Sequence, residues 1–155
     1  MTYPLNCETM ACHTQALAPK PATRGQRNHK PLNIRRSPRT RWLGQAREQY
    51  DREFVQFSCD LFGLRAAFRI IRTYIDLHDL HTLRHIIYRW APPEDGNCTE
   101  SYIATVSESS NVLPEYYLEY SDREQLIAIV AAMAYVESRM TFDHELLVKA
   151  YELAK

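Results

Sequence analysis

Glycine is scarce in this 155-residue chain, which has only four. Neither GxxxxGK(S/T) nor GxGxxG occurs, and this excludes the glycine-rich phosphate loops of P-loop and Rossmann proteins. Long apolar runs are also missing: no stretch of 18 apolar residues is present, and residues 1–20 hold no apolar run behind a basic start. We therefore expect no membrane span and no signal peptide.

Sequence motifs typical of metal sites are also missing. The four cysteines, at 7, 12, 59 and 98, form no CxxC pair. His81 and His85 are four residues apart and could face one metal, but Thr, Leu and Arg separate them, so this is not an HExxH motif. Free thiols and a solvated histidine face are the simpler interpretation. We expect no metal and no cofactor.

Acidic residues are absent between Lys20 and Arg41, where eight basic residues occur. The formal net charge of the chain is zero, so the remainder is acidic. Such asymmetry indicates an anionic partner, or a basic segment that folds against the acidic remainder. The sequence leaves both explanations open.

The hydrophobic content of 45% is enough for one domain with a core. Residues 1–23 are polar and irregular and predict a disordered tail. Residues 24–57 lack a helical period, and "EFVQFS" at 53–58 indicates one or two short strands. Apolar spacing after Ser58 predicts about five helices, near 58–75, 82–90, 99–109, 121–138 and 143–154. The expected fold is mainly α, a single small domain with an irregular, short-β, basic N-terminal segment.

Helix starts are suggested by polar residues that could cap them. Ser58 and Thr82 precede the first two helices, and either Asn97 or Thr99 could cap the third. The fourth opens with Ser121-Asp-Arg-Glu124, the pattern of a capping box.

Glu137 is the acid with the most unusual position. It follows Leu126, Val130 and Met133 on the inward stripe of an almost wholly apolar helix. Burial there would raise its pKa and suit a general acid. The competing interpretation is a structural glutamate at a helix end, paired with Arg139 or Lys149.

The loop "RWAPPEDGNCTESYI" at 89–103 holds a second group of acids. Glu94 and Asp95 lie near Glu100, so a catalytic carboxylate pair is conceivable. Acids beside Gly and Asn in a turn are more commonly solvent-facing loop residues.

Four blocks of the sequence together resemble a family of phage and prophage proteins labelled virion structural protein or structural protein P5-like. They are "RGQRNHKPLNIRRSPRTRWLG" at 24–44, "FVQFSCDLFGLRAAFRIIRTY" at 54–74, "TLRHIIYRWAPPEDGNCTESYIATVS" at 82–107 and "LIAIVAAMAYVES" at 126–138. The resemblance assigns 24–155 to one phage-type domain. The family's NNNPGN is here Asn28-His29-Lys30-Pro31-Leu32-Asn33, and "EDGN" replaces its usual "SEND" with a shift that blurs the match of Glu94.

The order of these blocks is also similar to a permuted lysozyme-like domain. "YVESRMTF" at 135–142 looks like the catalytic glutamate helix of that group but comes last, whereas the pieces that normally follow it come first. The resemblance implies a glycoside hydrolase or lytic transglycosylase that acts on peptidoglycan, with Glu137 as general acid. The substrate-binding residues implied are Asn28, Asn33, Trp42, Glu94 and Tyr102.

Two alternatives remain beside the enzyme. The chain could be a non-enzymatic virion or mobile-element protein that contacts other virion proteins, or a nucleic-acid binder that uses its basic arm. For the phage-type interpretation, the expected location is cytoplasmic before release, or associated with the virion.

Overall fold

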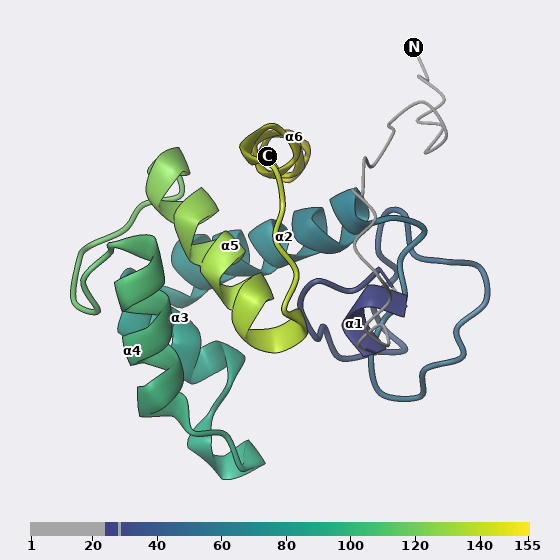
Figure 1. Cartoon of the computed structure of the whole chain (residues 1–155), viewed down its shortest axis with the longest axis horizontal. Helices are drawn as coiled ribbons and strands as arrows, with labels where there is room; N and C mark the ends of the chain where they lie inside the picture. Colours follow the sequence, from purple (N-terminus) through teal and green to yellow (C-terminus); the bar gives the residue numbers. More distant parts are fainter. Residues whose placement is uncertain (1–23, 28) are drawn as a thin grey trace, which may run out of the picture.

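Helices dominate the protein, as the computed structural model shows for residues 24–27 and 29–155 (Figure 1). The elements in chain order are α1 (Arg24–Arg27), α2 (Asp60–His78), α3 (Leu83–Trp90), the 3-10 helix η2 (Pro93–Asp95), α4 (Thr99–Ser110), α5 (Arg123–Ser138) and α6 (His144–Leu153). The single, mainly helical domain predicted from the sequence is confirmed, and α2 to α6 are the five expected helices. The predicted tail at 1–23 lies outside the described residues.

The short strands expected between 24 and 57 are reduced to isolated bridges. Arg35 bridges Phe54 and Gln45 bridges Phe57, both antiparallel, and no longer ladder forms in the described part of the chain. Pro31 and Pro38 have no backbone N–H to donate to a ladder, and Gly44 turns the chain with a φ of 70°. The segment is therefore extended and irregular.

Most of the expected helix caps are wrong. Thr82 does cap α3, because its side chain accepts from the His85 N–H at 3.2 Å. The N-caps of α2, α4 and α5 are instead Cys59, Cys98 and Asp122, none with a side-chain cap bond. The expected capping side chains bond elsewhere. Asn97 Nδ2 and the Thr99 hydroxyl donate to the carbonyls of Pro92 and Ala91, and Glu124 of α5 pairs with His144 of α6.

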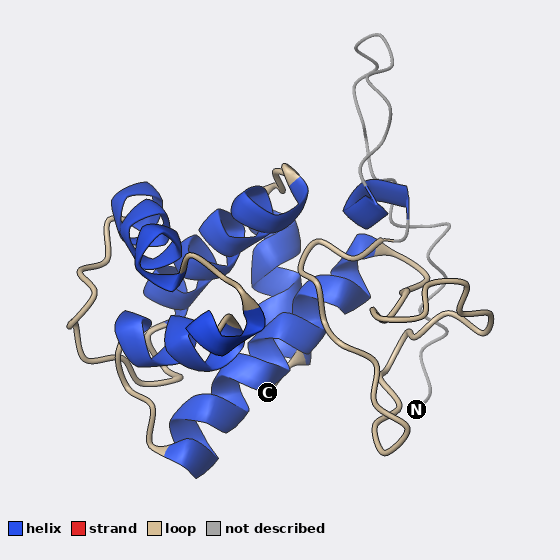
Figure 2. Cartoon of the chain, turned by 90° about the horizontal axis from the view of Figure 1, so that it is seen from below, coloured by secondary structure: helices blue, strands red, loops and turns tan. Residues whose placement is uncertain are grey.

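Two apolar clusters hold the domain together. The larger one packs α2 against the other helices and includes the fully buried Phe68, Ile71 and Val130. The smaller one joins the N-terminal segment to α2 and contains Ile34, Val55, Phe57, Phe62 and Ala66, with Trp42 and Trp90 against it. Figures 1 and 2 show the result: the helices gather at one side of the molecule, and the irregular segment lies at one end of α2, facing the C-terminal end of α5.

A buried ion pair anchors the irregular segment from inside. The Lys30 ammonium, 0% exposed, contacts Oδ2 of Asp51 and lies 4.6 Å from the centre of the Phe54 ring. Oδ1 of Asp51 accepts from the N–H groups of Glu53 and Phe54 at 3.0 and 3.1 Å. Because both of its oxygens have partners, the free-energy cost of burying the Asp51 carboxylate is offset. Part of the basic segment thus folds against acids, one of the two explanations left open by the sequence.

Gly44 is required by its surroundings. A Cβ there would lie 2.0 Å from Cγ of Phe62, and its φ of 70° is in the left-handed region. Gly96 also has a positive φ, 78°, but a Cβ there would meet no atom within 4 Å. Comparison of the two glycines therefore separates the conformational cost of adding a Cβ from its steric cost.

We predict that Gly44→Ala lowers the free energy of unfolding by about 3 kcal/mol, since it combines left-handed strain with overpacking against Phe62. Gly96→Ala should cost only about 1 kcal/mol, from conformation alone. Urea denaturation of both variants measures the difference. Equal losses would mean that Phe62 moves aside freely and that the second cluster does not constrain the segment.

Candidate functional site

Glu137 lies in the last turn of α5, at the corner where the helix meets the N-terminal segment. The helix ends at Arg139, which adopts the left-handed conformation (φ 59°) and donates its N–H to the Tyr135 carbonyl at 3.0 Å. Seven of the eight residues of α5 classed as buried are apolar. The apolar helix therefore carries the half-buried carboxylate of Glu137 into the interface between α5 and its neighbours.

Three donors from three different parts of the chain hold this carboxylate. The backbone N–H of Asn33 donates to Oε2 at 2.6 Å. The indole Nε1–H of Trp90 and the hydroxyl of Tyr102 each donate to Oε1 at 2.7 Å. Since these donors lie in the N-terminal segment, at the end of α3 and on α4, the carboxylate fixes all three relative to α5.

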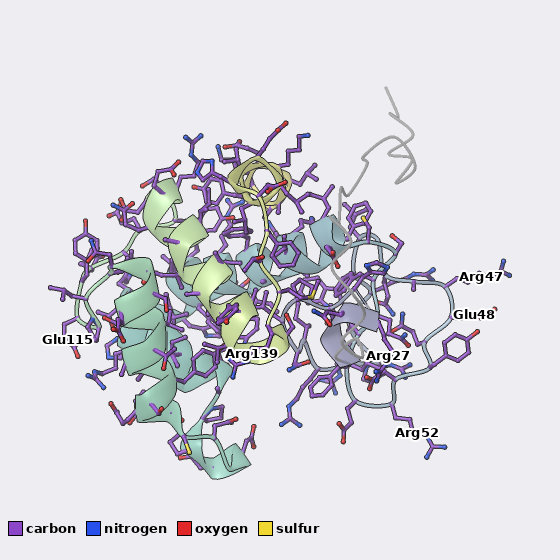
Figure 3. All side chains as sticks on the ribbon, in the orientation of Figure 1. Arg27, Arg47, Glu48, Arg52, Glu115 and Arg139 are labelled. Atoms are coloured by element: carbon purple, nitrogen blue, oxygen red, sulfur yellow. The ribbon has the colours of Figure 1, made fainter. Side chains whose placement is uncertain are left out.

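All three partners are neutral. The cations proposed as structural partners lie elsewhere: the Arg139 guanidinium sits 5.4 Å from the Tyr135 ring centre, and Lys149 pairs with Glu145 at 3.2 Å. Figure 3 shows Arg139 at the end of α5. Glu137 is therefore not the ion-paired helix-end glutamate of the competing interpretation.

Burial raises the pKa of Glu137 above its ordinary value of 4.5, and the hydrogen bonds from Asn33, Tyr102 and Trp90 oppose this rise without cancelling it. Burial, followed by the nearby Glu137, also raises the pKa of Tyr102. The phenol therefore stays protonated and acts as the donor in this contact. Desolvation dominates the site because no neighbouring charge offsets it.

The two carboxylate oxygens are not equivalent. Oε1 accepts two hydrogen bonds, which occupy both of its lone-pair directions. Among the described residues, Oε2 has one donor, the N–H of Asn33. One acceptor position remains on Oε2, and the proton of the neutral acid can reside there without breaking any of the three contacts.

The structure brings together some of the residues predicted from the sequence. Asn33 and Tyr102 contact Glu137 directly, although Asn33 does so through its backbone. Trp42 is half-buried against the smaller apolar cluster, the one around Ile34 and Phe62, which Trp90 also contacts. Glu94 is exposed in η2. Asn28 lies outside the described residues.

Trp90 as a ligand of the acid was not predicted, although its sequence "RWAPP" was singled out. An Nε1–H that donates to an acid 47 residues away leaves no periodic signal in the sequence. The ion pair of Arg35 with Asp95 at 3.3 Å was missed for the same reason.

The other sequence candidates have ordinary contacts. His81 Nδ1 lies 2.9 Å from the Leu118 carbonyl, and its ring stacks on Tyr117 with 4.6 Å between centres. Within residues 24–27 and 29–155, no group of three or more His, Cys, Asp or Glu side chains is arranged to hold a metal ion. In the same residues, no helix has the length and apolar character needed to cross a bilayer.

We predict that the Glu137→Gln variant is less stable than the wild type by about 1–3 kcal/mol, because one amide oxygen cannot accept from all three donors. The loss should depend on pH. Since folding raises the pKa of Glu137 above 4.5, its proton-linked stabilisation is complete below that pH and is lost as pH rises through the folded-state pKa. The amide of the variant does not titrate. Urea denaturation from pH 4 to 8 should therefore show the gap between the two proteins narrowing as pH rises; a gap that is constant or widens contradicts the raised pKa.

Comparison with known proteins identifies the chain's relatives. No protein-family model matches the chain. Protein P5 of Pseudoalteromonas phage PM2 is 33% identical over 134 residues, which cover 84% of this chain and 81% of the phage protein. Similarity of this extent confirms the resemblance predicted from the four sequence blocks. The chain belongs to the family of phage protein P5.

Proposed function

We propose that this phage-derived protein cleaves the glycan strands of peptidoglycan, with Glu137 as the general acid. The observation that carries the proposal is the carboxyl group itself. It is half-buried, its pKa is raised by burial, three neutral donors orient it, and Oε2 accepts a single hydrogen bond from the described residues. A raised pKa favours the protonated form that a general acid must have, and the three donors fix the orientation of the carboxyl group.

In the proposed step, the proton on Oε2 passes to the glycosidic oxygen as the bond to the sugar carbon breaks. The negative charge that forms on Glu137 is then stabilised by the donors already in place, Trp90 and Tyr102 on Oε1 and Asn33 on Oε2. Because these donors do not need to reorganise, the cost of creating the anion in a half-buried site is reduced.

A single acid favours the transglycosylase form of the reaction. Burial and three donors perturb the pKa of Glu137, and no carboxylate of the described residues contributes to this shift. A conventional glycosidase places its second carboxylate about 5–9.5 Å from the first. In the transglycosylase form a hydroxyl of the substrate sugar itself attacks, and Glu137, once ionised, accepts the proton of that hydroxyl.

The alternative is a non-enzymatic virion protein that assembles with other virion proteins. The same three hydrogen bonds support it, because they join the N-terminal segment, α3, α4 and α5 and so give Glu137 a structural role. The exposed arginines of the segment support nucleic-acid binding less well, since they form no helical stripe. In the virion alternative Glu137 stabilises the fold and transfers no proton.

A peptidoglycan zymogram tests the proposal. Wild type should clear the substrate, and Glu137→Gln should lose at least about a hundredfold in rate, the usual scale of general acid catalysis. Activity should fall as pH rises through the pKa of Glu137, since only the protonated acid can act.

The control is Glu145→Gln, which removes an exposed carboxylate that pairs with Lys149 at the surface of α6. It should clear as the wild type does. Circular dichroism confirms that each variant is folded. A folded wild type that clears nothing overturns the enzyme proposal and leaves the virion alternative.

A further inference from the structure

An exposed ion pair connects two of the three segments that hold Glu137. Arg35 Nη2 lies 3.3 Å from Asp95 Oδ2. Arg35 comes two residues after Asn33, which binds Oε2 of the acid, and Asp95 comes five residues after Trp90, which binds Oε1. The N-terminal segment and the RWAPP loop are thus joined twice, once through the half-buried Glu137 and once through this pair at the surface.

Backbone geometry sets the place of Arg35. Residues 34–36 are extended and pair with 53–55 through the Val55 N–H to the Ile34 carbonyl and the Arg36 N–H to the Glu53 carbonyl. The antiparallel bridge between Arg35 and Phe54 fixes the backbone at Arg35. Arg36 faces the other way and donates to the Asp51 carbonyl at 3.0 Å. Of these two arginines, Arg35 is the one that reaches the RWAPP loop, at Asp95, five residues after the Trp90 that binds Glu137.

The pair itself is suited to exchange. The Arg35 side chain is 74% exposed and that of Asp95 is 47% exposed. Exposed pairs are weak, because water and salt screen them. A guanidinium can form two parallel hydrogen bonds with a carboxylate, so an incoming carboxylate can replace Asp95 with little loss. Residues 24–53 also carry nine Lys or Arg against three Asp or Glu, which favours an anionic ligand at this end.

We propose that Arg35 is an anion-binding residue beside Glu137, that Asp95 occupies it in the free protein, and that a carboxylate of the substrate displaces Asp95. The inference rests on the proposed function and specifies its substrate: a glycan that carries peptide carboxylates near the cleaved bond, and not a neutral glycan. Asp95 then sets selectivity, since only a charged ligand gains by replacing it.

Binding tests this without turnover. The probes are a disaccharide-tetrapeptide fragment of peptidoglycan and the same disaccharide with the peptide removed, each titrated by calorimetry at low ionic strength. Wild type should bind the peptide-bearing fragment more tightly. Asp95→Asn should strengthen that binding about fivefold, because Arg35 no longer has an internal partner. Arg35→Gln should remove the preference, and Arg35→Gln with Asp95→Asn should behave as Arg35→Gln does.

Arg47→Gln is the matched control: it removes an exposed arginine of the same basic segment, on a loop that Figure 3 shows extending away from the helices. It should keep the preference. The inference is overturned if Arg35→Gln keeps the preference, if Asp95→Asn has no effect, or if neither fragment binds. These outcomes are separate from cleavage. A preference that depends on Arg35, without clearing of peptidoglycan, supports the anion site and contradicts the enzyme proposal. Clearing without a preference supports the enzyme proposal and contradicts the anion site.

Discussion

The carboxylate of Glu137 is the constraint on which this arrangement depends. Its three donors come from an irregular segment, from the last residue of α3 and from α4, and they meet at the end of α5. An acid placed in an apolar interface is unfavourable unless it is hydrogen-bonded, and these donors compensate it. The same contacts therefore explain why the N-terminal segment docks at this corner and why the acid keeps a fixed orientation. Structure and proposed chemistry depend on one group.

A second buried charge keeps the irregular segment in place. Lys30 contacts Asp51 inside the segment. Leu32, two residues after Lys30, is fully buried in the larger apolar cluster. His29 takes a positive φ and contacts Asp60 at 3.1 Å, which raises the pKa of the imidazole. These three residues are the ones that depart from the family pattern around Asn33. Their contacts lie in the packing of the segment, and the group that binds Glu137 is a backbone N–H, which a change of neighbouring side chain does not remove.

Periodicity was sufficient to predict the helices and the inward face of Glu137, because a long apolar helix leaves a strong pattern in the sequence. The partners of Glu137 were only partly predictable. Asn33 binds Glu137 through its backbone, which almost any residue could supply. Trp90 binds through its indole N–H, but the sequence is equally consistent with a tryptophan that only packs its apolar ring. Cap assignments failed for a related reason: Asn97, Thr99 and Glu124 are engaged by loop carbonyls or by another helix, contacts that local sequence does not encode. Charge asymmetry in the sequence indicated a basic end, but the pairing of Arg35 with Asp95 required the folded chain.

The titration of the Glu137 carboxyl carbon in the folded wild-type protein, followed by carbon-13 NMR and assigned by comparison with Glu137→Gln, tests the central claim most directly. Burial against three neutral donors predicts a midpoint above the ordinary 4.5, with the tryptophan indole proton of Trp90 shifting at the same pH. A midpoint at or below 4.5 would mean that the donors outweigh desolvation. Glu137 would then be an ionised structural carboxylate and could not serve as a general acid near neutral pH.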